Sequence, residues 1–242
     1  MQHGNYANGA RTAEHKDLTV VSLNMAKEKV HDKILRDLRK TPFFETADIW
    51  LFQEAMKTIP EIARTMGLNY VYAPTEDSGL AILSRYPIGN PERIPLSQHN
   101  VIFRSRCRIA LSAKIQSLEV VNVHLDNRIG KQQRLDQASP LLNGERVIVG
   151  GDFNTANIRW IMHLLPVPGP NHSGALRDMF VAHGFESPLD QAGSTFKLLH
   201  LPLHLDWIFP KDLKAVAAGV EKIDFSDHNA VWVALNPAET IH

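Results

Sequence analysis

Short hydrophobic runs recur along this chain at lengths and spacings typical of β-strands. They predict nine strands, at residues 18–23, 48–52, 70–73, 80–83, 109–115, 118–123, 146–149, 205–209 and 230–235. Other segments place hydrophobic residues three or four positions apart, as on one face of a helix, and predict helices at 30–39, 59–66, 131–142 and 175–183. Because the strands outnumber the helices, we expect a fold built on β-sheets.

The connections between these runs indicate how the sheets are arranged. Gln116 and Ser117 separate two alternating runs, which predicts a hairpin. The sheets should therefore be mixed or antiparallel, unlike the parallel sheet of a doubly wound fold. Residues 1–17 are small, polar and without pattern, so we expect a flexible N-terminal tail. No repeat or linker divides the remainder, which predicts a single domain at 18–242.

The composition is that of an ordinary globular protein. Hydrophobic residues make up 44% of the 242 residues and charged residues 21%, which is enough to bury a substantial core. Lys and Arg together number 26, as do Asp and Glu, so there is no overall positive field that would attract a polyanion. Any contact with nucleic acid must then be local. Cys107 is the only cysteine, which excludes an intramolecular disulfide.

The sequence shows no membrane or export segment. No hydrophobic stretch approaches the roughly 18 to 20 residues of a membrane-spanning helix. The polar start Met1-Gln2-His3-Gly4-Asn5 lacks the hydrophobic core of a signal peptide. We therefore expect a cytoplasmic monomer, or a secreted or periplasmic protein if an N-terminal signal was removed.

The most informative strand end follows the run Arg146-Val147-Ile148-Val149. Here Gly150 and Gly151 precede a carboxylate, Asp152, and a carboxamide, Asn154. Glycine lets the backbone turn where a side chain would obstruct it, and loops held by strands commonly carry function. Taken alone, the same residues fit a purely structural turn equally well. What the other strands carry at their ends decides between the two interpretations.

Polar side chains also lie at or beside the ends of several other strand-like runs. They are Asn24, Glu54, His124, Asp126, Asp206, Asp227 and His228. Mg²⁺ and Mn²⁺ prefer oxygen ligands such as carboxylates, whereas structural zinc is held by cysteine and histidine. The oxygen-rich set therefore favours magnesium or manganese.

The order of short motifs along the chain completes the pattern. The motifs are Ser22-Leu23-Asn24, Gln53-Glu54, Gly79-Leu80-Ala81-Ile82-Leu83-Ser84-Arg85, Asn122-Val123-His124-Leu125, Gly151-Asp152-Phe153-Asn154, Leu205-Asp206-Trp207-Ile208-Phe209 and Ser226-Asp227-His228. In this order the chain resembles the endonuclease/exonuclease/phosphatase superfamily. The resemblance implies an α/β fold, a four-layered α/β sandwich in which two mixed or antiparallel β-sheets pack face to face with helices on the outside. It also implies metal-dependent hydrolysis of phosphate esters.

The resemblance implies a metal site for Mg²⁺ or Mn²⁺ formed by Glu54, Asn24 and Asp227. Many nucleases of this superfamily carry a further acid shortly after the asparagine. Here Met25-Ala26 follow instead, and the nearest acid is Glu28. We therefore expect a cation at Glu54, alone or as one of two metals, in surroundings that differ from those of a typical nuclease.

The resemblance also implies catalytic roles. Asp152 would orient or deprotonate the attacking water, and Asn154 would bind the phosphate. His228, oriented by Asp206, would donate to the phosphoryl oxygens as negative charge builds there. His124 would contact the phosphate from the other side and protonate the leaving oxygen. Charge neutralisation, an aligned water and a stabilised leaving group are what phosphoryl transfer requires.

Arginines near these motifs leave two interpretations open. Arg104, Arg106 and Arg108 alternate, so in a strand they would share one face and bind substrate phosphate, or lie on an ordinary solvent face. Arg128 and Arg134 present the same choice.

These observations lead to a Mg²⁺- or Mn²⁺-dependent phosphodiesterase whose substrate is nucleic acid. The alternative is a phosphoesterase acting on a phospholipid, a phosphoinositide or a small-molecule phosphate, because the balanced charge offers no broad surface for DNA. A catalytically silent binding module of the same fold is the third possibility, since a fold does not by itself determine function.

Overall fold

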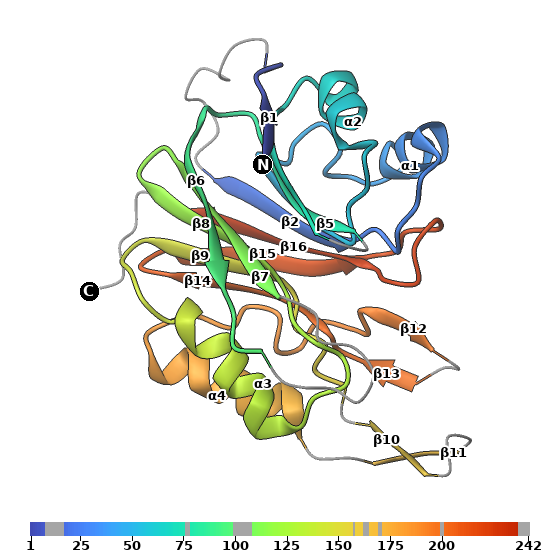
Figure 1. Cartoon of the computed structure of the whole chain (residues 1–242), viewed down its shortest axis with the longest axis vertical. Helices are drawn as coiled ribbons and strands as arrows, with labels where there is room; N and C mark the ends of the chain where they lie inside the picture. Colours follow the sequence, from blue (N-terminus) through green and yellow to red (C-terminus); the bar gives the residue numbers. More distant parts are fainter. Residues whose placement is uncertain are drawn as a thin grey trace.

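The computed structural model describes residues 1–7, 17–75, 78–98, 108–156, 158–161, 165–168, 171–198 and 201–236 (Figure 1). Its framework is a seven-stranded and a five-stranded sheet. In spatial order the larger sheet holds β1 (Gln2–Gly4), β4 (Asn69–Pro74), β5 (Gly79–Ser84), β3 (Ile49–Gln53), β2 (Leu18–Asn24), β16 (Ala230–Asn236) and β15 (Lys214–Glu221). The smaller sheet holds β14 (Asp206–Lys211), β9 (Val147–Asp152), β8 (Leu118–His124), β7 (Ile109–Ile115) and β6 (Ile88–Pro95). Within these sheets β2–β3 and β8–β9 are parallel pairs and the other pairs are antiparallel.

The helices lie on the outer faces of the two sheets, which gives four layers (Figure 1). Helices α1 (His31–Leu38) and α2 (Ile59–Met66) pack on the larger sheet. Helices α3 (Lys131–Ala138) and α4 (His172–Ala182) pack on the smaller one, with a short 3-10 helix, Ser139–Leu141, after α3. Two small hairpins, β10 (Ile158–Ile161) with β11 (Leu165–Pro168) and β12 (Phe196–Leu198) with β13 (Leu201–Leu203), lie outside these layers. The predicted sandwich of two mixed sheets is confirmed.

The hydrophobic core explains why the strands read as nearly continuous apolar runs. In β3, Leu51 faces the other sheet, whereas Trp50 and Phe52 pack under α1 and α2. Successive strand residues point to opposite faces, and here both faces are covered. A strand buried on both sides must therefore be apolar at consecutive positions.

Two amide side chains cross from one sheet to the other. Gln53, on β3, donates from Nε2 to Oδ1 of Asn122, on β8, over 2.7 Å. Asn122 in turn donates from Nδ2 to the carbonyls of Phe52 and Ala81, each over 2.9 Å. Both amides are fully buried. Because buried polar groups are costly unless paired, these bonds fix one relative placement of the two sheets.

The predicted elements agree with the structure in their positions, with small shifts at their ends. Each of the nine predicted strands is present, and β7 and β8 form the predicted hairpin, with Gln116 at a positive φ of 55° in its turn. The last two predicted helices differ at their boundaries. The third ends its α-helical part at Ala138, and the fourth already begins at His172.

The expected flexible tail needs correction. Residues Gln2–Gly4, which the sequence places in an unpatterned tail, form β1 and pair with β4. The edge strands β6 and β15 were also missed. β6 contains Pro91 and Pro95 and is largely exposed, and β15 is interrupted by a register shift between Ala215 and Ala217. Such strands lack a clear hydrophobic pattern because only part of each faces the core.

We expect Asn122→Ala to lower the free energy of unfolding by about 3 kcal/mol, because it removes three buried hydrogen bonds, to Gln53 and to the carbonyls of Phe52 and Ala81. Urea denaturation followed by circular dichroism measures this change. Ser117→Ala, in the exposed hairpin turn, is the control and should change it by less than about 0.5 kcal/mol. A loss below about 1 kcal/mol for Asn122→Ala would contradict the role of the amide tie.

Candidate active site

Strand direction brings the predicted polar residues to one edge of the sandwich. Parallel β8 and β9 end beside each other, and antiparallel β14 begins at the same edge. The register therefore aligns His124 with Asp152, and Asp152 with Asp206. In the other sheet, Asn24 at the end of β2 lies opposite Gln53, the residue before Glu54.

The two glycines of β9 allow close approach on two sides. A Cβ at Gly150 would lie 2.6 Å from Leu51 Cδ1 of the facing sheet. At Gly151, where φ is +149°, a Cβ would lie 2.0 Å from the Val123 carbonyl oxygen of the neighbouring strand. The neighbouring backbone excludes a side chain at Gly151, and a side chain at Gly150 would displace buried Leu51, so both glycines favour the packing that places Asp152.

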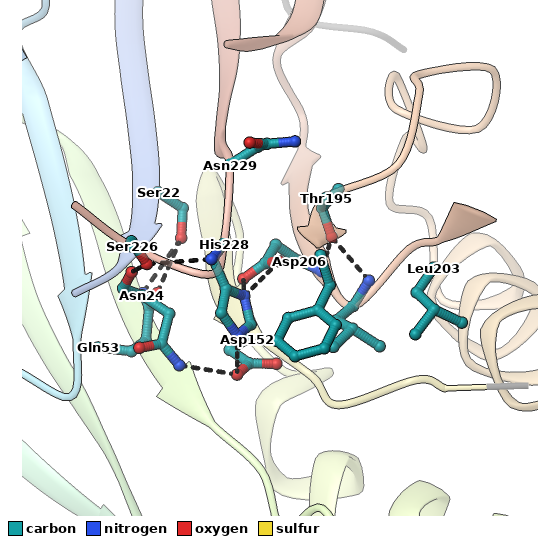
Figure 2. A network of polar contacts seen from close by, with 12 residues as sticks. Ser22, Asn24, Gln53, Asp152, Thr195, Leu203, Asp206, Ser226, His228 and Asn229 are labelled. Carbon is teal, nitrogen blue, oxygen red and sulfur yellow. Dashed lines mark hydrogen bonds and ion pairs between the residues drawn. The ribbon is translucent and has the colours of Figure 1, made fainter. Parts of the chain in front are cut away.

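Asp152 is the centre of the polar contacts at this edge (Figure 2). Its Oδ1 accepts from the backbone N–H of Asn154 over 2.9 Å, and its Oδ2 accepts from Asn24 Nδ2 over 3.0 Å. The Nε2 atoms of His124 and His228 lie 3.5 and 3.8 Å from the same Oδ2. Asp152 is 1% exposed, so these groups replace water around its carboxylate.

His228 lies between two carboxylates. Its Nδ1 is 3.1 and 2.9 Å from the two oxygens of Asp206, while its Nε2 faces Asp152. Burial alone would lower the pKa of the His228 imidazole, but the charges of Asp206 and Asp152 and the hydrogen bond that the imidazole donates to Asp206 raise that pKa to about 10. The ring therefore carries a positive charge at neutral pH, and Asp206 fixes its orientation.

The loop before His228 is tied to the end of β2. Ser226 Oγ donates to the Asn24 carbonyl over 2.6 Å and accepts from the His228 backbone N–H over 3.0 Å (Figure 2). Asn24 Oδ1 accepts from the Ala26 backbone N–H over 2.9 Å. The amide that contacts Asp152 is therefore held from two sides.

Asn154 and Glu54 both have left-handed backbone conformations at the ends of strands. Their φ values are 52° and 49°, uncommon for residues other than glycine. Asn154 Nδ2 donates to the Leu125 carbonyl over 2.8 Å, which joins the loops after β9 and β8. Glu54 is partly exposed. Burial raises the pKa of its carboxyl, Asp152 and Asp227 add to the rise, and Lys27 and His228 oppose it.

Other predicted residues lie elsewhere or have different partners. Asp227 is exposed beside His228, and Arg128 is exposed on the loop after β8. Arg104 and Arg106 lie outside the described residues. Glu28, the nearest acid after Asn24, accepts backbone N–H groups at the start of α1 and pairs with Lys33.

The other two arginines, Arg108 and Arg134, have partners within the protein. Arg108 Nε donates to Asp126 Oδ1 over 2.7 Å, so this pair is internal. Arg134 is 2% exposed and donates from Nη1 to the carbonyls of Asp126 and Phe153, over 2.6 and 2.8 Å. Burial lowers the pKa of the Arg134 guanidinium to about 10. Arg134 therefore supports the loops behind the site and does not face solvent.

Sequence reasoning missed the supporting roles of three residues. Ser226 stands in a quoted motif and was given no role, although its hydroxyl joins two parts of the edge. The bonds of Arg134 to backbone carbonyls leave no sequence pattern. Thr195 is fully buried and bonded to the backbone beside Asp206, again without a sequence signal.

Two helix-covered sheets with carboxylates, amides and imidazoles at a common edge define the class of protein. The chain belongs to the endonuclease/exonuclease/phosphatase family, whose model matches residues 21–228. Members of this family are hydrolases that act on phosphoester bonds. The predicted family is thus confirmed over most of the chain.

Solved structures share the fold at low sequence identity. A humanized D. rerio TDP2 has a TM-score of 0.65 at 18% identity, covering 92% of this chain and 100% of its own. The 3′ phosphatase NExo from Neisseria has a TM-score of 0.62 at 16% identity, with coverages of 89% and 98%. An AP endonuclease from Archaeoglobus fulgidus has a TM-score of 0.65 at 16% identity, with coverages of 90% and 99%.

Two further findings bear on these comparisons. No curated protein is a significant match to the chain by sequence. Within the part of the chain that the structure describes, no helix has both the length and the apolar character needed to cross a membrane.

Proposed function

We propose that this protein hydrolyses phosphodiester bonds in nucleic acid with the help of a bound divalent cation. The observation that carries the proposal is the setting of Asp152, a buried carboxylate that faces nitrogen atoms of three other side chains from both sheets. Preorganised groups of this kind can align a nucleophile and stabilise charge that develops on a phosphoryl group.

Asp152 is the proposed acceptor of the proton from the attacking water. Its Oδ1 is held by the Asn154 backbone N–H and its Oδ2 by Asn24, so the carboxylate cannot rotate freely. A general base must hold a fixed position within hydrogen-bond reach of the water. The Asn154 side chain, next to this carboxylate, is the proposed contact for a phosphate oxygen.

The two histidines are the proposed donors to the phosphate. Charged His228, held by Asp206, presents Nε2–H on the side of Asp152, where it would stabilise negative charge on phosphoryl oxygens. His124 approaches Asp152 from the smaller sheet and is proposed to give a proton to the leaving oxygen.

Glu54, Asp227 and Asn24 are the proposed holders of Mg²⁺ or Mn²⁺. Their oxygens suit a hard cation. Burial is the main cause of the raised pKa of Glu54, with smaller contributions from Asp152 and Asp227, and a cation would favour the charged form of this carboxyl. A bound divalent cation would supply charge neutralisation at the phosphate oxygens. Asp152, Asp206 and His228 also lie close enough together to hold a metal. Their contacts favour a proton on His228 instead of a metal ion, because His228 Nδ1 already has a hydrogen bond to Asp206.

Nucleic acid is the proposed substrate on two grounds. Among the similar structures, NExo holds a product DNA hairpin and D. rerio TDP2 a single-strand DNA product. On this chain, exposed Lys29 and Lys57 line a cavity of about 450 Å³ together with Glu61. Lys57 follows Glu54 by three positions in the sequence. Two cations at this place could bind phosphates that flank the scissile one.

We expect Asp152→Asn and His228→Ala each to lower kcat on bis-nitrophenyl phosphate with Mg²⁺ by at least ~100-fold, since each removes a group that moves a proton or stabilises charge. Steady-state kinetics on folded variants measures the loss. Asp178→Asn, an exposed acid on α4, is the matched control and should keep wild-type kcat. Wild-type turnover by either site variant would refute the proposed mechanism.

Glu54→Gln should raise the Mg²⁺ concentration needed for half-maximal activity by about tenfold or more, because an amide is a weaker ligand than a carboxylate. A Mg²⁺ titration of activity measures this shift. Glu92→Gln, exposed on β6, is the control with the same chemical change. An unchanged titration for Glu54→Gln would remove Glu54 from the proposed ligands.

The substrate itself is tested by offering single- and double-stranded DNA, RNA and phospholipid vesicles with one metal series. We expect cleavage of nucleic acid, and Lys29→Gln with Lys57→Gln should reduce kcat/KM on an oligonucleotide about tenfold more than on bis-nitrophenyl phosphate. Lys114→Gln with Lys211→Gln is the control pair, because these lysines lie toward the ends of β7 and β14 that are remote from the candidate active site. Turnover of phospholipid without cleavage of any nucleic acid would establish the alternative substrate class.

A further inference from the structure

The pair formed by Asp206 and His228 spans two different sheets. Asp206 begins β14 at the edge of the smaller sheet, and His228 precedes β16 in the larger one. Among the described strands, no backbone ladder joins the two sheets. The 2.9 Å contact between His228 Nδ1 and Asp206 Oδ2 therefore depends on groups outside the ladders.

Thr195 contacts the chain on both sides of this pair (Figure 2). Its Oγ1 accepts from the backbone N–H groups of Leu205 and Asp206, over 2.8 and 3.1 Å. Its carbonyl accepts from the backbone N–H of Asn229, next to His228, over 2.7 Å. Thr195 is fully buried, so no water competes for these bonds.

The residues that follow Thr195 strengthen its hold on the His228 side. The Phe196 ring packs edge-on against the His228 ring, with centroids 4.8 Å apart. The Lys197 backbone N–H donates to the Asp227 carbonyl over 2.9 Å, and its Nζ donates to the carbonyls of Ile223 and Ser226. The loop that carries His228 is therefore held at several positions. On the other side of the pair, Thr195 contacts Leu205 and Asp206 through its hydroxyl oxygen.

We propose that Thr195 is a positioning residue, whose hydroxyl sets the place of Asp206 relative to His228. The hydroxyl oxygen accepts the N–H of Asp206 itself, so its loss would leave the start of β14 held by its pairing with β9 and without its bond toward the His228 side. A shift of Asp206 would loosen the orientation of the imidazole, and small displacements of reacting groups strongly reduce rates. The inference rests on the proposed function, which assigns the reaction to this pair.

Thr195→Val tests the proposal because valine has nearly the same shape and lacks the acceptor oxygen. We expect kcat on bis-nitrophenyl phosphate to fall about tenfold or more while KM changes less than about twofold. Thr195→Ser, which keeps the hydroxyl, should restore kcat to within about threefold of wild type. Thr46→Val, in an exposed loop, is the control and should leave both constants unchanged.

Combining Thr195→Val with Asp206→Asn separates positioning from a general structural effect. If the hydroxyl acts through Asp206, the double variant should be no slower than Asp206→Asn by more than about twofold. The proposal would be overturned if the losses of kcat in the two single variants multiplied in the double variant. It would also be overturned by wild-type kcat in Thr195→Val, or by a loss of kcat in Thr195→Ser as large as that in Thr195→Val. If the valine variant does not fold, Thr195→Cys, a weak acceptor of similar size, replaces it.

A second readout does not need turnover. The low-field proton resonance of the His228 Nδ1–H reports its bond to Asp206, and it should move upfield or broaden in Thr195→Val but not in Thr195→Ser. An unchanged resonance in the valine variant would refute the positioning role even if the protein cleaved no phosphodiester. Absence of turnover in the wild-type protein would instead refute the proposed function.

Discussion

The structure depends on the fixed placement of its two sheets against each other, which the buried bonds between Gln53 and Asn122 enforce. Hydrophobic packing between sheets is non-directional and by itself tolerates sliding. A buried amide has one arrangement in which its donors and acceptors are all paired. The candidate active site takes Asn24 and His228 from one sheet and His124 and Asp152 from the other, so a shift between sheets would separate them.

The groups at the edge of the sandwich compensate each other's charge in the near absence of water. His228 carries its proton because Asp206 and Asp152 lie on either side. The pKa of Arg134, behind the loops, is likewise subject to opposing effects. Burial lowers it, and the charges of Asp152 and Asp126 raise it. Glu54 and Asp227 add negative charge at the outer side, which is where the proposed cation would be favourable. The same acids that would perform the chemistry are thus held in place by cations of the protein.

Sequence patterns located most of the framework because the central strands are buried on both faces. In β3, the apolar run Ile49-Trp50-Leu51-Phe52 is typical of a strand covered on both faces. Helix α1 has one apolar face, on which Ile34, Leu35 and Leu38 are buried. Edge elements lacked such a signal. β1 exposes most of its residues and exists because its backbone pairs with β4, a contact that depends on distant sequence.

The sequence by itself determined which chemical groups stand at the ends of strands, because a strand ends where its apolar run ends. It therefore placed Asn24, Glu54, Asp152 and Asp206 at candidate positions, and the order of the motifs indicated the family. Only the tertiary structure decided which groups meet. The register of β8, β9 and β14, and the approach of His228 from the other sheet, involve residues up to 76 positions apart. Such contacts are set by packing and by hydrogen bonds such as those of Thr195 and Arg134, and these leave no local pattern in the chain.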